Sequence, residues 1–114
     1  MPLLLTDTAK QDIRTILNST LDDFGQVQAQ RYAALMDRLF ALIEEAPERP
    51  GSRARNNVRT GLRSINMSAL SERRHGASHV VYYRTEYGDG APRVIVIRIL
   101  HERMDPDLHL GSTP

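Results

Sequence analysis

The sequence predicts an α+β protein, in which an N-terminal helical hairpin packs on one face of a small antiparallel β-sheet and a short helical turn ends the chain. Two observations carry this prediction. Apolar residues recur at helical spacing through residues 1–46, and the second half instead shows short apolar runs separated by Gly and Pro. With 114 residues, the chain is expected to form one domain over 1–114 that buries a core without a metal or disulfide.

The first half carries the two predicted helices. Residues 3–5 are expected to form a short strand, and Thr6 is an N-cap candidate for the first helix. Gly25 predicts its end, because glycine is the usual residue just beyond a helix C-terminus. The second helix has the clearest pattern, since its apolar residues step by three and four before Pro47 ends it. These residues are Tyr32, Leu35, Met36, Leu39, Phe40 and Ile43.

The second half has an extended pattern. Residues 62–65, 79–85 and 93–100 are predicted to be three consecutive antiparallel strands. The polar stretch 67–78 is expected to be an exposed connection. Asp105-Pro106 is typical of an N-cap followed by proline at the first helical position, which predicts a final turn through Leu110.

The last predicted strand is apolar on both faces. Strict alternation places Ile95, Ile97 and Ile99 on one face, and the other face then receives Val94, Val96 and Leu100. A strand of this kind is expected to be covered on both sides, and the helical hairpin can cover only one. Two sources of further cover remain open: a partner chain, or the chain's own tail together with the 67–78 connection.

Charge is unevenly distributed although the net charge is only +1. Residues 49–84 hold eight arginines against the single acid Glu72, a net charge of +7. Arginine binds carboxylates and phosphates through two parallel hydrogen bonds, so this stretch favours an anionic partner. An ordinary solvated surface of ion pairs explains the same residues about equally well.

Catalytic and metal-binding motifs are absent. The chain has no cysteine, and the histidines His75, His79, His101 and His109 lack the spacing of a helical zinc motif. No phosphate loop, nucleophile elbow or paired-carboxylate motif occurs. We therefore expect no metal, no cofactor and no catalytic residue. No apolar run is long enough to span a bilayer, so we expect a cytoplasmic protein without membrane contact.

A set of arginines, tyrosines and histidines remains after these exclusions. Such a set could cleave RNA without metal, with arginine stabilising the phosphorane charge and a histidine or tyrosine moving the proton. It could equally bind an acidic protein surface or a DNA backbone. Arg84 and Arg98 could also simply pair with Glu86 or Glu102. The set comprises Arg63, Arg84, Arg98, Arg103, Tyr82, Tyr83, Tyr87 and His101.

From Leu5 to Leu110 the chain resembles the ParE branch of the RelE/ParE toxin superfamily. The most specific matches are the runs His79-Val80-Val81-Tyr82-Tyr83-Arg84 and Val94-Ile95-Val96-Ile97-Arg98-Ile99-Leu100-His101. Weaker pieces precede them in the family's order, among them Phe24-Gly25 and Gly61-Leu62-Arg63-Ser64. One departure is the long 65–78 connection, which is longer than in many relatives, so target contacts there are not carried over.

The resemblance implies the toxin of a type II toxin–antitoxin system, which inhibits DNA gyrase by protein contact. It also implies a cognate antitoxin whose C-terminal segment wraps the toxin, so that operator DNA is contacted only through the antitoxin. The alternatives are a RelE-like, ribosome-dependent mRNA endoribonuclease and a non-toxic binding module of the same fold. No tyrosine follows Tyr87, which favours ParE over RelE, although His101 could substitute.

Two sets of contact residues are expected from this resemblance and the predicted surface. For the target, the C-terminal strand and tail are favoured, and the expected contacts are Arg84, Arg98, His101, Arg103 and Asp105. A competing interpretation of His101, Arg103 and Asp105 is a polar corner that fixes the final turn. For the antitoxin, the margins of the hairpin and the outer sheet face are favoured: Tyr32, Met36, Phe40, Val94, Val96 and Leu100.

Overall fold

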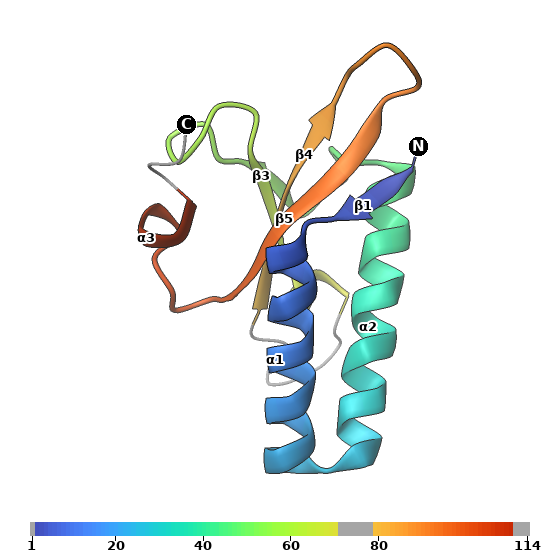
Figure 1. Cartoon of the computed structure of the whole chain (residues 1–114), viewed down its shortest axis with the longest axis vertical. Helices are drawn as coiled ribbons and strands as arrows, with labels where there is room; N and C mark the ends of the chain where they lie inside the picture. The colour runs from blue at the N-terminus through green and yellow to red at the C-terminus, as the bar shows by residue number, and fades with distance from the viewer. Residues whose placement is uncertain (1, 71–78, 111–114) are drawn as a thin grey trace.

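A helical hairpin precedes most of the strands along the chain (Figure 1). The computed structural model describes residues 2–70 and 79–110. The elements are β1 (Leu3–Leu5), α1 (Asp7–Phe24), α2 (Gln26–Glu45), β2 (Ser52–Ala54), β3 (Arg63–Asn66), the 3-10 turn η1 (Met67–Ala69), β4 (His79–Glu86), β5 (Arg93–His101) and α3 (Pro106–Leu110). The molecule measures 43 × 29 × 25 Å, and the hairpin projects beyond the sheet at one end.

The five strands form one sheet in the order β1-β5-β4-β3-β2. The predicted run β3-β4-β5 is antiparallel, as expected. Two features differ from the prediction: β2 adds an antiparallel edge strand beside β3, and β1 lies parallel to β5. The α+β class with a helical hairpin is therefore confirmed, but the sheet is mixed. The short strand expected over residues 3–5 is confirmed as β1, whereas the three residues of β2 carry too little periodicity to be assigned from sequence.

Both helices begin and end where local sequence dictates. The Thr6 hydroxyl accepts a hydrogen bond from the Ala9 N–H at 3.0 Å, which caps α1 as predicted. Gly25 lies between the helices with φ +88°, a conformation that glycine adopts without strain. A single residue therefore turns the chain between α1 and α2, and the two helices lie side by side (Figure 1).

The larger core lies between the helical hairpin and the sheet. From the helices it takes the fully buried residues Ala9, Met36, Leu39 and Ile43. The sheet contributes Ile65, Val81, Tyr83, Val94, Val96 and Ile99. Met67 of η1 is also fully buried here, so the expectation that residues 67–78 form an exposed connection is wrong at its start. The rest of that stretch, 71–78, lies outside the described residues.

The opposite sheet face has its own smaller core. Tyr82 and Leu100 are covered by Val58 and Leu62, which lie on the connection between β2 and β3, and by Leu110 of α3. The chain therefore covers this part of the second face itself. The tail contributes to the cover, as one of the two alternatives expected. The other contribution comes from residues 58–62, whereas the prediction named the 67–78 connection. A partner chain is not needed for these residues.

A β-bulge changes the side-chain phase of β5. Tyr82 pairs with Arg98 and Tyr83 with Val96, which leaves Ile97 as an extra residue. As a result Val94, Val96 and Ile99 pack in the larger core, whereas Ile97 and Leu100 pack in the smaller one. The expected division into Ile95, Ile97 and Ile99 against Val94, Val96 and Leu100 is therefore wrong, because strict alternation does not hold across a bulge.

Candidate functional site

Arg98, an expected target contact, is tied to the first helix. Its Nε lies 2.8 Å from Asp12 Oδ2 and its Nη2 lies 3.0 Å from Asp12 Oδ1. The side chains are only 23% and 13% exposed. A two-pronged pair of this kind fixes both groups, so Arg98 holds α1 against β5. Replacing it is expected to loosen the fold, because the Asp12 carboxylate would lose its partner.

The C-terminal corner is organised by its own polar groups. His101 Nδ1 accepts a hydrogen bond from the Arg103 N–H at 3.1 Å. Asp105 Oδ1 accepts from the Asp107 N–H at 2.9 Å, which makes Asp105 the cap of α3 as the sequence predicts. His101 and Asp105 therefore both accept hydrogen bonds from backbone N–H groups of this corner, which agrees with their interpretation as a polar corner. The Arg103 side chain remains exposed.

Arg84 belongs to a group of ion pairs at the C-terminal end of β4. Its Nη2 lies 3.0 Å from Glu86 Oε2, and Arg93 pairs with the other Glu86 oxygen at 2.5 Å. Hydrogen bonding and charge from Arg93, with a smaller contribution from Arg84, lower the pKa of Glu86. Arg84 thus pairs with Glu86, one of the two alternatives the sequence left open, and its side chain is still 40% exposed.

Three ring side chains meet where β4 begins and β5 ends. The Tyr32 hydroxyl lies 2.6 Å from His79 Nδ1, and His79 meets the His101 ring edge-on at 5.5 Å. Burial, reinforced by the His101 charge, lowers the pKa of His79 from 6.5 to about 4, while Glu102 and Asp12 act in the opposite direction. His79 is therefore neutral at pH 7. The sequence singled out Tyr32 and His101 separately but did not place them on either side of His79.

Four of the six expected antitoxin contacts are core residues. Met36, Val94, Val96 and Leu100 are at most 2% exposed because the sheet, the helices and α3 cover them. Their side chains are closed to a partner, and we remove them from the candidate surface. Tyr32 and Phe40 are partly buried and lie at the margin of the larger core.

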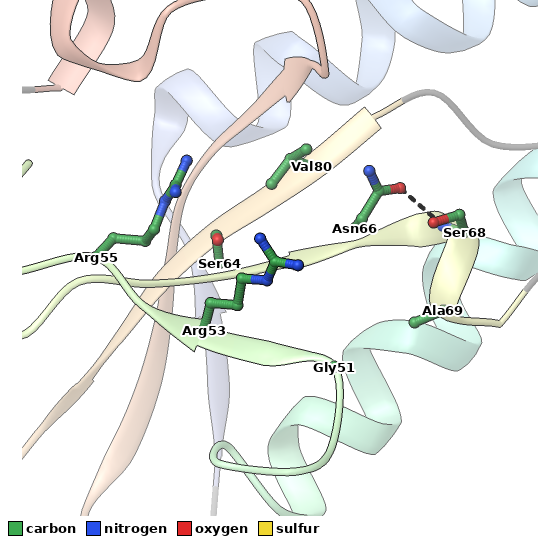
Figure 2. A pocket seen from close by; sticks show the side chains of 8 residues that line it. All are labelled: Gly51, Arg53, Arg55, Ser64, Asn66, Ser68, Ala69 and Val80. Carbon is green, nitrogen blue, oxygen red and sulfur yellow. Dashed lines mark hydrogen bonds between the residues drawn. The ribbon is translucent and has the colours of Figure 1, made fainter.

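A basic pocket that the sequence reasoning did not single out lies on the sheet face opposite the helices. It has a volume of about 390 Å³ and is lined by Gly51, Arg53, Arg55, Ser64, Asn66, Ser68, Ala69 and Val80 (Figure 2). Its two arginines belong to the arginine-rich stretch 49–84. The clustering of arginine was the available signal, but only the β2–β3 pairing, which sets Arg53 opposite Ser64, brings these residues together.

The tip of the helical hairpin exposes apolar side chains. Leu21, Phe24 and Val27 are 46%, 72% and 60% exposed, and they flank the Gly25 turn. Exposed apolar side chains gathered in one place often mark a contact surface. The sequence distinguished Phe24 only as part of the Phe24-Gly25 piece of the family resemblance, because periodicity alone does not show that the hairpin extends beyond the sheet.

No metal-binding group or membrane segment is found in the parts of the chain that the structure describes. Residues 2–70 and 79–110 contain no cluster of three or more side chains suited to hold a metal ion. Within the same residues, no helix is both long and apolar enough to cross a bilayer.

Comparison with known proteins places this fold in a family. The family model described as the ParE toxin of the type II toxin–antitoxin system parDE matches residues 3–106, which run from β1 to the first residue of α3. The chain belongs to the ParE toxin family. The resemblance seen in the sequence is thereby confirmed, and a toxin of this system type implies a protein antitoxin as partner.

Individual ParE relatives match along nearly their whole length. Toxin ParE1 of Caulobacter vibrioides is 35% identical over 111 residues, covering 96% of this chain and 98% of the relative. Toxin ParE1 of Mycobacterium tuberculosis is 32% identical over 108 residues, with coverages of 94% and 95%. A YoeB/ParE toxin from Agrobacterium tumefaciens has the same fold, with a TM-score of 0.61 at 16% identity, covering 89% and 98% of the two chains.

Proposed function

We propose that this ParE-family toxin acts in the cytoplasm, where it inhibits DNA gyrase by protein–protein contact and without catalysis. A cognate antitoxin neutralises it by wrapping its C-terminal segment around the toxin, and operator DNA is contacted only through that antitoxin. The observation that carries the proposal is the family match over residues 3–106, which includes nearly every element of the fold.

The state of the charged side chains supports action without catalysis. Arg98 pairs with Asp12 and Arg84 with Glu86, so neither guanidinium is held ready for a developing phosphorane charge. His101 already accepts a hydrogen bond at Nδ1 from the following turn. A ribonuclease of the RelE type would need such groups to converge on one reacting phosphate.

The runner-up function is ribosome-dependent mRNA cleavage. One observation favours it: Tyr32, His79 and His101 form a ring cluster in which His79 is neutral at pH 7, as a proton acceptor must be, although a pKa of about 4 makes it a weak base. Its Nδ1 is engaged with the Tyr32 hydroxyl, however, and burial reduces access to the ring. This function predicts sensitivity to His101→Ala or Arg84→Ala.

The proposed contact surfaces follow from exposure. For gyrase we retain Arg84 and Arg103 as direct contacts, because both reach solvent, and we assign Arg98, His101 and Asp105 to holding the strand end and tail in place. For the antitoxin we retain Tyr32 and Phe40 at the margin of the hairpin.

A supercoiling assay tests the proposal. Purified gyrase is mixed with the antitoxin-free chain, and linear, relaxed and supercoiled plasmid are separated on a gel. Blocked supercoiling or accumulated linear plasmid, reversed by the antitoxin, is the expected result. Unaffected gyrase with a preparation that still arrests growth would overturn the gyrase proposal, and cleaved transcripts on ribosomes would then support the runner-up.

A further inference from the structure

The basic pocket is lined by both polar and aliphatic side chains. Arg53 and Arg55 rise from β2 and the residue just after it, on the same sheet face as Ser64 and Asn66 (Figure 2). Ala69 and Val80 supply aliphatic surface beside them. A volume of about 390 Å³ is within the range that binds small ligands or a few side chains.

The backbone of Arg55 is fixed by hydrogen bonds, whereas its side-chain Nε lacks one among the described residues. Its backbone N–H donates to Leu62 O at 2.7 Å, and its carbonyl accepts from Val58 and Arg59, so its position is fixed by the turn. Its guanidinium carbon lies 6.0 Å from the centre of the Tyr82 ring. Its Nε is buried and has no hydrogen-bond partner among the described residues. A buried donor without a partner is unfavourable, and movement of the guanidinium toward an oxyanion in the pocket would give this donor an acceptor.

The pocket's positive charge is not neutralised within the described residues. Neither Arg53 nor Arg55 forms an ion pair there, whereas Arg63, Arg84, Arg93 and Arg98 each do. Glu102 contacts the lining residue Asn66, from which it accepts a hydrogen bond at 3.4 Å, but its side chain is exposed. The Asn66 side chain is further fixed because its Oδ1 accepts from the Ser68 N–H at 2.9 Å.

We propose that this pocket binds a carboxylate side chain from an acidic, aliphatic segment of the antitoxin, with Arg53 and Arg55 as the two binding cations. The inference rests on the proposed function, because it names a contact of the same toxin–antitoxin complex. Paired guanidiniums match carboxylate geometry, and Val80 and Ala69 match the aliphatic neighbours of that residue.

A protein carboxylate fits better than a nucleic-acid phosphate for two reasons. The family's system type implies a protein partner. Aliphatic Val80 and Ala69 are among the residues that line the pocket, whereas a groove that follows a nucleic-acid backbone is lined by charge and by aromatic rings on which bases stack.

Nuclear magnetic resonance of the arginine Nε–H groups in the full-length chain tests the site directly. The probe is the capped peptide acetyl-Leu-Glu-Glu-Leu-amide, compared with acetyl-Leu-Gln-Gln-Leu-amide and with inorganic phosphate. The glutamate peptide is expected to shift the Arg55 Nε–H signal and the Ser64 and Asn66 amides in a saturable manner. The glutamine peptide is expected to leave them unchanged, and phosphate to act only at higher concentration.

Two variants separate binding from folding. Arg53→Gln removes an exposed cation that makes no ion pair in the described residues, and is expected to weaken peptide binding about tenfold with an unchanged spectrum elsewhere. Arg38→Gln removes an equally exposed cation on α2 and is expected to leave binding unchanged.

Three outcomes would overturn the site: no saturable shift, equal loss of binding in both variants, or tighter binding of phosphate than of the peptide. The last would assign the pocket to a ligand that carries a phosphate group. Peptide binding by a chain that fails to inhibit gyrase would leave the site standing while the gyrase proposal falls. Gyrase inhibition without peptide binding would remove the site alone.

Discussion

The Asp12 carboxylate on α1 binds both the Arg98 guanidinium and the Ile99 N–H on β5. The Ile99 nitrogen lies 2.9 Å from Asp12 Oδ2, and Arg98 reaches both carboxylate oxygens. This contact occurs where β5 continues beyond its last pairing with β1, at Val96. Asp12 of α1 therefore accepts a hydrogen bond from the part of the β5 edge that β1 does not pair with. The contact joins Asp12 to Arg98, 86 positions further along the chain.

Asp12→Ala is expected to lower the free energy of unfolding by about 2–3 kcal/mol, because it leaves the Arg98 charge and the Ile99 N–H without their acceptor. Urea denaturation measures the change. Asp37→Ala on the exposed side of α2 is the matched control, since it brings the same gain in helix propensity. Equal stability of the two variants would contradict a structural role for the pair.

His79 is expected to make the fold less stable in mild acid. The unfolded chain takes up a proton on His79 near pH 6.5, whereas the folded chain does so only near pH 4, where burial and His101 have placed its pKa. The contribution of neutral His79 to the free energy of unfolding is therefore complete above pH 6.5, and it is lost as the pH falls from 6.5 to about 4. Urea midpoints from pH 7 to 4 measure this, and His79→Gln should flatten the profile. An unchanged profile in that variant would refute the assignment to His79.

Tyr83→Phe is expected to lower the free energy of unfolding by about 1–2 kcal/mol. The fully buried Tyr83 hydroxyl donates to Pro47 O and accepts from the Ser52 hydroxyl, which itself accepts from Arg63 Nε at 2.8 Å. The network ties β2 and the exit of α2 to the sheet. Tyr87→Phe, at a side chain 78% exposed, is expected to have no effect. Thermal denaturation distinguishes the two, and identical midpoints would contradict the network's contribution.

Gly25→Ala is expected to destabilise the protein by about 1 kcal/mol, because a side chain at φ +88° is strained even though no atom of the described residues lies within 4 Å of the added carbon. Gly88→Ala is the control, since Gly88 also lies in open space and has no such φ. Denaturation by urea measures both changes. A more stable Gly25→Ala chain would show that α1 and α2 join without a left-handed residue.

Arg103→Gln is expected to weaken gyrase inhibition while changing the free energy of unfolding by less than about 0.5 kcal/mol, because its side chain is exposed. The supercoiling assay measures inhibition, and urea denaturation checks the fold. Arg31→Gln, an exposed charge change on α2, is the comparison. Full inhibition by Arg103→Gln would remove this residue from the proposed gyrase contact.

Local sequence determined the helices and the three long strands. The Thr6 cap, the Gly25 turn, the apolar spacing of α2 and the Asp105 cap act within a few residues, so periodicity and capping chemistry suffice to predict them. The order of weak family motifs along the chain was likewise sufficient to indicate the ParE family, which the comparison with known proteins confirmed.

Only the tertiary structure decided which apolar and charged residues are available to a partner. The bulge at Ile97 reassigned the faces of β5, α3 and residues 58–62 covered the second face, and pairing with the distant Asp12 engaged Arg98. Arg53 and Arg55 met Ser64 and Asn66 only through the β2–β3 register. These outcomes depend on contacts between residues far apart in the chain, and local spacing carries no information about such contacts.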